Sequence, residues 1–184
     1  MEFCYDELVT YPVSRVYPVL RDELVQLPPY LPGVDRIELI EREALSEGRT
    51  RIDNKWFGNS SSAPPPVRPF ITGEMTTWID HALWQDEQKK VEWTFETVWF
   101  GKLYDCSGVN YFEDAGEGKT RIRLTGTIQV YPERVPGVPK LLARRLRPQV
   151  EKYLIQAVTP NLAQLPKALQ AFLDTSDDAV ESGA

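Results

Sequence analysis

The chain has 184 residues, a length that fits one domain and is sufficient to bury a sizeable core. Its net charge of −6 at pH 7 and its pI of about 5.0 argue against a protein that mainly neutralises nucleic-acid phosphates. Apolar residues make up 42% and charged residues 26%, which is typical of a soluble globular protein. No nucleic-acid partner is therefore expected.

The N-terminal region is predicted to form a strand followed by a helix. Residues 1–11 mix aromatic, branched and acidic side chains in a short extended pattern, and Pro12 stands where a helix can begin. Pro18 argues against an unbroken helix over 12–24. One apolar helical face is nevertheless indicated by spacings of three and four at Val13, Val16, Leu20 and Leu24.

A proline-rich segment, VQLPPYLPG at 25–33, comes next. Any helix there is limited to a turn or two by Pro28, Pro29, Pro32 and Gly33. From Ile37 the apolar period changes to two, which predicts a half-buried strand with Leu39 on the same face. Residues 49–58 are predicted to complete a hairpin, with one face formed by Ile52, Asn54 and Trp56.

The middle of the chain is predicted to be an antiparallel meander. Residues 59–73 contain four prolines and three serines, so they are expected to form a long loop that is either functional or disordered. Strand patterns then return at 74–85, 90–101, 103–113 and 119–131. The last of these has one apolar face, opposite charged and polar residues, formed by Ile122, Leu124, Ile128 and Val130.

After Pro136-Gly137 the pattern becomes helical to about Leu173. Three prolines must kink or divide this helix, namely Pro148, Pro160 and Pro166. Residues 174–184 are small and acidic and are expected to be a disordered tail, so the folded domain spans 1–173.

This order of elements resembles the SRPBCC superfamily, which includes START lipid-binding domains, polyketide cyclases and the birch-pollen allergen group. The resemblance covers about residues 1–172 and rests on LPPYLPGVDRIELIE, on the meander of 36–131 and on VPGVPKLL before the closing helix. It implies the α+β helix-grip fold. In that fold a curved antiparallel sheet of about six to seven strands wraps around a long C-terminal helix, and two short helices follow the first strand.

The resemblance also implies a cavity between sheet and helix that holds an apolar or amphipathic ligand. The proline-rich segment would then hold the short helices at the rim, beside loop 59–73, as two sides of an entrance. Tryptophans on the strands either fill the core or line the cavity, and both interpretations remain open. The expected ligand-binding residues are Asn54, Trp56, Trp78, Asp80, Trp93, Phe95, Trp99, Cys106, Asn110, Leu124, Leu146, Val150, Tyr153 and Ala157.

The sequence offers little for catalysis or metal binding. His81 is the single histidine, and no GxSxG, GxGxxG or Walker-type motif occurs, so no metal and no cofactor are predicted. Asp80 and His81 are adjacent and must face opposite sides of a strand, which favours a surface pair over a catalytic dyad. GEGKT at 116–120 is interpreted as a hairpin turn.

Cysteine usage and the N-terminus predict a cytoplasmic protein. Cys4 and Cys106 lack CxxC spacing and are interpreted as small buried hydrophobes, although a pairing between them remains open. No signal peptide and no integral membrane segment are expected. A basic cluster is either a solvated face or a peripheral contact for an anionic membrane: Lys140, Arg144, Arg145, Arg147 and Lys152.

Three functions are compatible with these features. The first is binding, with transport or presentation, of a hydrophobic small molecule such as a lipid or polyketide in the internal cavity. The second is a polyketide cyclase or aromatase that uses the same cavity, with polar groups drawn from Tyr104, Asn110, Asp80 and Tyr153. The third is a chaperone-like or toxin-type interaction module, which would show an exposed apolar patch on the outer sheet face. Because no motif marks a catalytic residue, binding is favoured.

Overall fold

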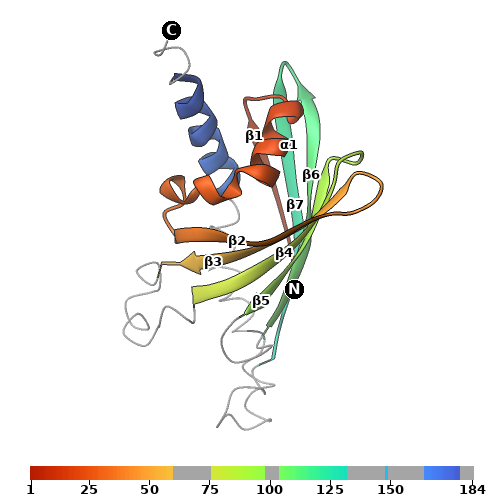
Figure 1. Cartoon of the computed structure of the whole chain (residues 1–184), viewed down its shortest axis with the longest axis vertical. Helices are drawn as coiled ribbons and strands as arrows, with labels where there is room; N and C mark the ends of the chain where they lie inside the picture. Colours follow the sequence, from red (N-terminus) through yellow and green to blue (C-terminus); the bar gives the residue numbers. More distant parts are fainter. Residues whose placement is uncertain (60–75, 98–103, 132–147, 149–163, 179–184) are drawn as a thin grey trace.

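The computed structural model describes residues 1–59, 76–97, 104–131, 148 and 164–178. In this part of the chain, antiparallel strands form one curved seven-stranded sheet in the order β1-β7-β6-β5-β4-β3-β2 (Figure 1). The strands are β1 (Glu2–Val9), β2 (Val34–Ala44), β3 (Arg49–Gly58), β4 (Thr77–Gln85), β5 (Lys90–Thr97), β6 (Tyr104–Gly116) and β7 (Lys119–Val130). The predicted meander is confirmed, and β1 joins it by pairing with β7.

The helix α1 (Val13–Asp22) lies on one face of the sheet (Figure 1). Its buried residues are Val16, Tyr17 and Leu20, which lie on the predicted apolar side. The Tyr17 ring meets Trp84 and Phe112 edge-on, each at a centroid distance of 5.2 Å. The helix continues through Pro18. The aromatic contacts of Tyr17 stabilise the helix and offset the loss of the one backbone N–H donor that Pro18 lacks.

The proline-rich segment forms two single-turn 3-10 helices, η1 (Leu24–Gln26) and η2 (Pro28–Tyr30), as short as the sequence predicted. Three leucines anchor the segment in the core: Leu24, Leu27 and Leu31. Tyr30 lies edge-on against Phe172, with ring centroids 5.9 Å apart, so the segment also contacts the C-terminal helix. The other side of the expected entrance, loop 59–73, lies outside the described residues except for Asn59.

Side chains alternate between two faces of the sheet, and we call the face that packs against α1 the inner face. The strand residues predicted to be apolar and inward are buried there: Ile37, Ile52, Ile122, Leu124 and Ile128. Leu39 lies opposite Asn54 and shares the inner face with Ile37, as predicted, but its expected burial is wrong because its side chain is 53% exposed. β2 is an edge strand, and the core covers Ile37 but leaves Leu39 in contact with solvent.

Residues 164–178 form a C-terminal helix whose buried side chains join the core: Ala168, Leu169 and Leu173. The helix includes 174–178, which the sequence assigned to the tail. The Tyr11 hydroxyl donates to Asp174 at 2.9 Å, and two guanidinium nitrogens of Arg15 donate to Asp177. These contacts from the N-terminal region hold the last turns in place. The rest of the predicted helix, apart from residue 148, lies outside the described residues.

Two glycines on the inner face let aromatic rings lie directly against the backbone. A Cβ atom at Gly108 would lie 2.3 Å from the Trp93 ring and 2.3 Å from the Thr125 carbonyl oxygen. A Cβ atom at Gly126 would lie 2.5 Å from the Phe3 ring. Only glycine permits such close approach, so these two positions fix where the Phe3 and Trp93 rings lie.

Gly108→Ala is expected to lower the free energy of unfolding by about 1–3 kcal/mol, because Trp93 has to move away from the strand. Urea unfolding at neutral pH measures the change. The control is Ser107→Ala on the opposite face of the same strand, which should change stability by less than about 0.5 kcal/mol. Equal stability of the two variants would contradict the role of this glycine.

Candidate ligand-binding site

Four of the predicted site residues form a block on the inner face of β3 and β4. In the antiparallel register Asn54 lies opposite Asp80, and Trp56 lies opposite Trp78. Residues two apart on a strand share a face, so all four side chains project to the same side. Asn54 is 4% exposed and Asp80 is 8% exposed, so both polar residues point into the protein. We call these four residues the Asp80 block.

A row of aromatic rings extends from this block across the inner face. The Trp56 and Trp78 rings stack at 5.5 Å between centroids and 17° between planes. Phe95 lies 6.1 Å from Trp78 and stacks on Trp93 at 4.6 Å. Phe3 of β1 continues the row at 6.5 Å from Trp93. Rings from four strands thus form a row of two stacked pairs, between which Trp78 and Phe95 are tilted by 52°, and Phe3 is the member that the sequence did not single out.

The Asp80 carboxyl group is buried, and its Oδ1 atom has no hydrogen-bond partner. Burial raises the pKa of Asp80 to about 7, and the charge of Asp53 adds to this rise. His81 and the indole N–H of Trp56 oppose it, although that N–H does not reach hydrogen-bond geometry. Asp80 therefore exchanges a proton near neutral pH.

Two donors in the same block also lack partners, the buried indole N–H groups of Trp56 and Trp78. Leaving a buried polar group unpaired costs about 1–3 kcal/mol, and folded proteins pair the large majority of such groups. The three unpaired polar atoms in this block of four residues therefore lower the stability of the ligand-free protein. The block presents one acceptor and two donors that a bound molecule can satisfy.

The other predicted polar residues already have local roles. The Asn110 amide oxygen accepts a hydrogen bond of 2.9 Å from the indole N–H of Trp93. Burial raises the pKa of the Cys106 thiol to about 12, so the thiol is not a nucleophile at neutral pH. Burial, followed by the effect of Cys106, raises the pKa of Tyr104 to about 12. These groups support the core beside the aromatic row.

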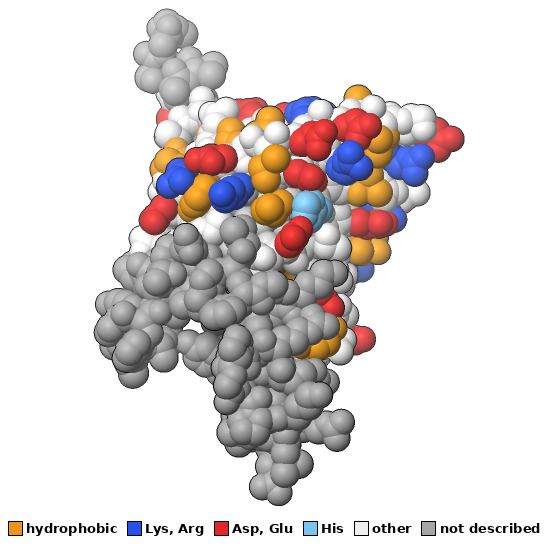
Figure 2. All heavy atoms as spheres, turned by 60° about the horizontal axis from the view of Figure 1, so that its bottom comes forward, with side chains coloured by type: hydrophobic (Ala, Val, Ile, Leu, Met, Phe, Trp, Pro, Cys, Tyr) orange, Lys and Arg blue, Asp and Glu red, His pale blue; other side chains and the backbone are white. Residues whose placement is uncertain are grey.

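His81 lies on the outer face of the sheet, as adjacency to Asp80 required, but the interpretation of a surface pair is wrong because Asp80 is buried. Its Nδ1 atom lies 3.1 Å from Asp53 and its Nε2 atom 3.2 Å from Glu96. Burial lowers the pKa of His81, but Glu96 and Asp53 outweigh this effect and the net change is upward. Figure 2 shows the histidine among acidic side chains.

The two cysteines cannot pair, because they lie on opposite faces of the sheet. Cys4 lies opposite Thr125 on the outer face and is exposed, so its interpretation as a buried hydrophobe is wrong. Cys106 lies opposite Phe95 on the inner face and is buried, as expected. The short polar residues of the neighbouring strand leave Cys4 in contact with solvent.

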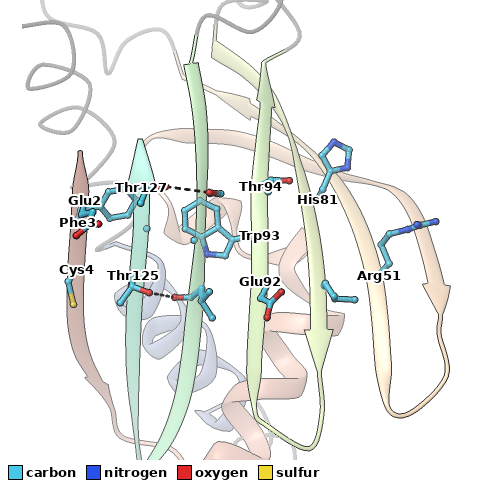
Figure 3. A pocket seen from close by; sticks show the side chains of 15 residues that line it. Glu2, Phe3, Cys4, Arg51, His81, Glu92, Trp93, Thr94, Thr125 and Thr127 are labelled. Carbon is cyan, nitrogen blue, oxygen red and sulfur yellow. Dashed lines mark hydrogen bonds between the residues drawn. The ribbon is translucent and has the colours of Figure 1, made fainter. Parts of the chain in front are cut away.

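An open hollow of about 870 Å³ lies on the outer face, across β1, β7, β6, β5, β4 and β3 (Figure 3). Its lining includes short polar side chains and charged residues at the rim, among them Thr94, Thr125, Thr127, Glu92 and Arg51. Trp93 is the predicted site residue that contributes to it. This hollow lies across the sheet from the expected cavity and contains none of the unpartnered polar atoms of the Asp80 block.

Several predicted residues lie outside the described residues and stay predictions. The ligand-binding residues in this group are Trp99, Leu146, Val150, Tyr153 and Ala157. The basic cluster at 140–147 and Lys152 also lies there. Within the described residues, no helix is long and apolar enough to cross a membrane. The same ranges contain no group of three or more His, Cys, Asp or Glu side chains suited to a metal ion.

Comparison with solved structures identifies the architecture. A protein from Thermus thermophilus superposes with a TM-score of 0.62 at 24% identity, covering 93% of this chain and 98% of the other. The ZhuI aromatase/cyclase from Streptomyces sp. R1128 gives a TM-score of 0.68 at 16% identity, covering 95% and 93%. Norcoclaurine synthase from Thalictrum flavum, in complex with dopamine and hydroxybenzaldehyde, gives 0.62 at 15% identity, covering 94% and 86%.

The chain has the helix-grip fold. The fold that the resemblance implied is thus confirmed. No family model matches the sequence, and no curated protein matches it. At such low identities the shared helix-grip fold does not transfer an activity from one protein to another.

Asp80→Asn is expected to stabilise the unliganded protein increasingly as pH rises. The pKa of Asp80 is raised in the folded state, so ionisation destabilises folding from about pH 4 upward, and the penalty levels off above about pH 7. A rise from 3.8 to about 7 corresponds to roughly 4 kcal/mol as an upper limit. The measurement is the difference in unfolding free energy between the variant and the original protein from pH 4 to 8. A difference that does not change with pH would contradict the burial of this carboxyl group.

Proposed function

We propose that this helix-grip protein binds a hydrophobic small molecule on the inner face of its sheet, at the Asp80 block and the adjoining aromatic row. The observation that carries the proposal is that three of the four unpartnered buried side-chain atoms of the described residues lie in this block: Asp80 Oδ1, Trp56 Nε1 and Trp78 Nε1. The fourth, Asp53 Oδ1, lies on the outer face beside His81. A ligand that pairs with these atoms recovers part of the free energy that their burial costs.

The surroundings of these atoms also suit a small-molecule site. Such sites are mostly apolar and aromatic, with a few polar groups that fix the orientation of the ligand. The rings of Trp56, Trp78, Phe95 and Trp93 supply apolar surface beside the polar atoms. The outer hollow also has apolar lining residues, among them Phe3 and Trp93, but it contains none of the unpartnered polar atoms of the Asp80 block.

A second candidate function is ring closure of the aromatase or cyclase type. The pKa of about 7 at Asp80 suits a group that accepts and returns a proton at neutral pH. The fold of the ZhuI aromatase/cyclase is compatible with this alternative. In the sheet, the inner-face neighbours of Asp80 are Asn54 and Phe95, neither of which titrates. Binding is therefore the better supported function.

Protein purified from its native host is expected to retain a small molecule in native mass spectrometry and to release it on denaturation. The double variant Trp56→Ala/Trp78→Ala should lose the retained mass, because it removes both indole donors and the start of the aromatic row. Trp84→Phe is the control and should retain it, since Trp84 packs against Tyr17 and Phe112 instead.

A retained mass that is unchanged in the double variant would contradict the proposed site. Complete absence of a bound mass from the original protein would contradict the proposed function. If the ligand-free protein converts the released compound into a product, the second candidate function replaces the first.

A further inference from the structure

We infer that the ligand carries a hydroxyl group on a planar conjugated ring, with Asp80 accepting a hydrogen bond from that hydroxyl and Trp56 and Trp78 donating to ligand oxygen. This inference rests on the proposed binding function and specifies the chemistry of the ligand. Its basis is the combination of one unpartnered acceptor and two unpartnered donors within the Asp80 block.

The three groups are close together in the sheet. Trp56 and Trp78 are direct cross-strand partners, and Asp80 lies two residues beyond Trp78 on the same strand and face. The two indole rings stack on each other, so both N–H donors belong to one compact pair near the carboxyl group. A polar substituent of a ligand bound between this pair and Asp80 would meet both kinds of group.

The chemistry of the groups discriminates among ligand substituents. A hydroxyl group donates one hydrogen bond and accepts others, so it can satisfy Asp80 and an indole N–H together. An ammonium group only donates, and it leaves both indole N–H groups unpaired. A carboxylate only accepts and is repelled by ionised Asp80, while an ether gives Asp80 no donor.

The aromatic row indicates the shape of the part that carries the hydroxyl group. Trp93 and Phe95 stack at 4.6 Å between centroids, and the stacked Trp56 and Trp78 pair continues the row, with Phe95 tilted by 52° against Trp78. A planar ring packs against such a row in the offset-stacked or edge-to-face arrangements that aromatic groups prefer. A flexible acyl chain would gain no comparable stacking.

The test compares three probes of one ring system by isothermal titration calorimetry at pH 7.5: 2-naphthol, 2-methoxynaphthalene and 2-naphthylmethylammonium. We expect 2-naphthol to bind the original protein about tenfold or more tightly than its methyl ether, as for a buried hydrogen bond to a charged group. Asp80→Leu should reduce this preference to about twofold or less, and Trp56→Phe/Trp78→Phe should weaken naphthol binding while keeping the rings.

Two controls match these variants. Glu92→Leu removes a carboxylate from the outer face of the neighbouring strand β5, and Trp84→Phe shortens a tryptophan elsewhere in the core. Both should leave the preference for naphthol unchanged, and urea unfolding checks that every variant is folded.

Each outcome separates the inference from the proposed function. Equal affinity for naphthol and its ether, or tighter binding of the ammonium probe, overturns the hydroxyl inference and leaves the binding function standing. The same conclusion follows if Asp80→Leu keeps the full preference. Failure of all three probes to bind the original protein overturns the planar-ring inference, whereas the binding function is overturned only if no retained mass is found in native mass spectrometry.

Discussion

The candidate site depends on a carboxyl group, that of Asp80, placed where water cannot fully solvate it. Asp80 lies in β4 between Asn54 of β3 and Phe95 of β5, and one of its oxygens has no partner. An ionised carboxylate in such a place is costly, and the protein responds by keeping the group protonated up to about neutral pH. Natural proteins retain such a cost chiefly where function requires it. The same position places the carboxyl group, with Asn54, beside the aromatic row of the inner face.

The surrounding sheet determines what this group meets. Alternation places Trp56 and Trp78 on the face of Asp80 and sends His81 to the opposite face, where Asp53 and Glu96 surround it. His81 is therefore absent from the inner face, so it cannot form an acid and base pair with Asp80 there. Because positions 108 and 126 are glycines, the Trp93 and Phe3 rings can lie against the backbone of β6 and β7, and the aromatic row continues there. The inner face is consequently suited to holding a planar molecule at one polar end.

Much of this architecture could be predicted from the sequence, because strand patterns with one charged face fix which side is buried. Ile122, Leu124 and Ile128 alternate with arginine and threonine, and all three are buried as predicted. The stretch TWIDHALW was ambiguous, since apolar residues occur on both faces, and the burial of Asp80 emerged only from its pairing with β3 and β5. The exposure of Leu39 was missed, because alternation shows which face a residue shares but not how far the core covers an edge strand.

Other features depend on contacts that no local pattern contains. The helix reaches residue 178 because Tyr11 and Arg15, more than 160 positions earlier, pair with Asp174 and Asp177. The missing hydrogen bonds of Trp56 and Trp78 are likewise a property of packing and cannot be seen in residue order. The fold could therefore be named from the chain alone, whereas the position of the candidate site required coordinates.

The most direct test of the proposed site is the pH titration of the Asp80 carboxyl carbon by ¹³C NMR in the ligand-free protein and after addition of a binding probe. We expect a midpoint near 7 in the ligand-free protein, and a lower midpoint once a hydroxyl group donates to the carboxylate. A ligand-free midpoint near 4, roughly the ordinary value for a solvated aspartate, would show that Asp80 is not buried without a partner and would contradict the proposed site.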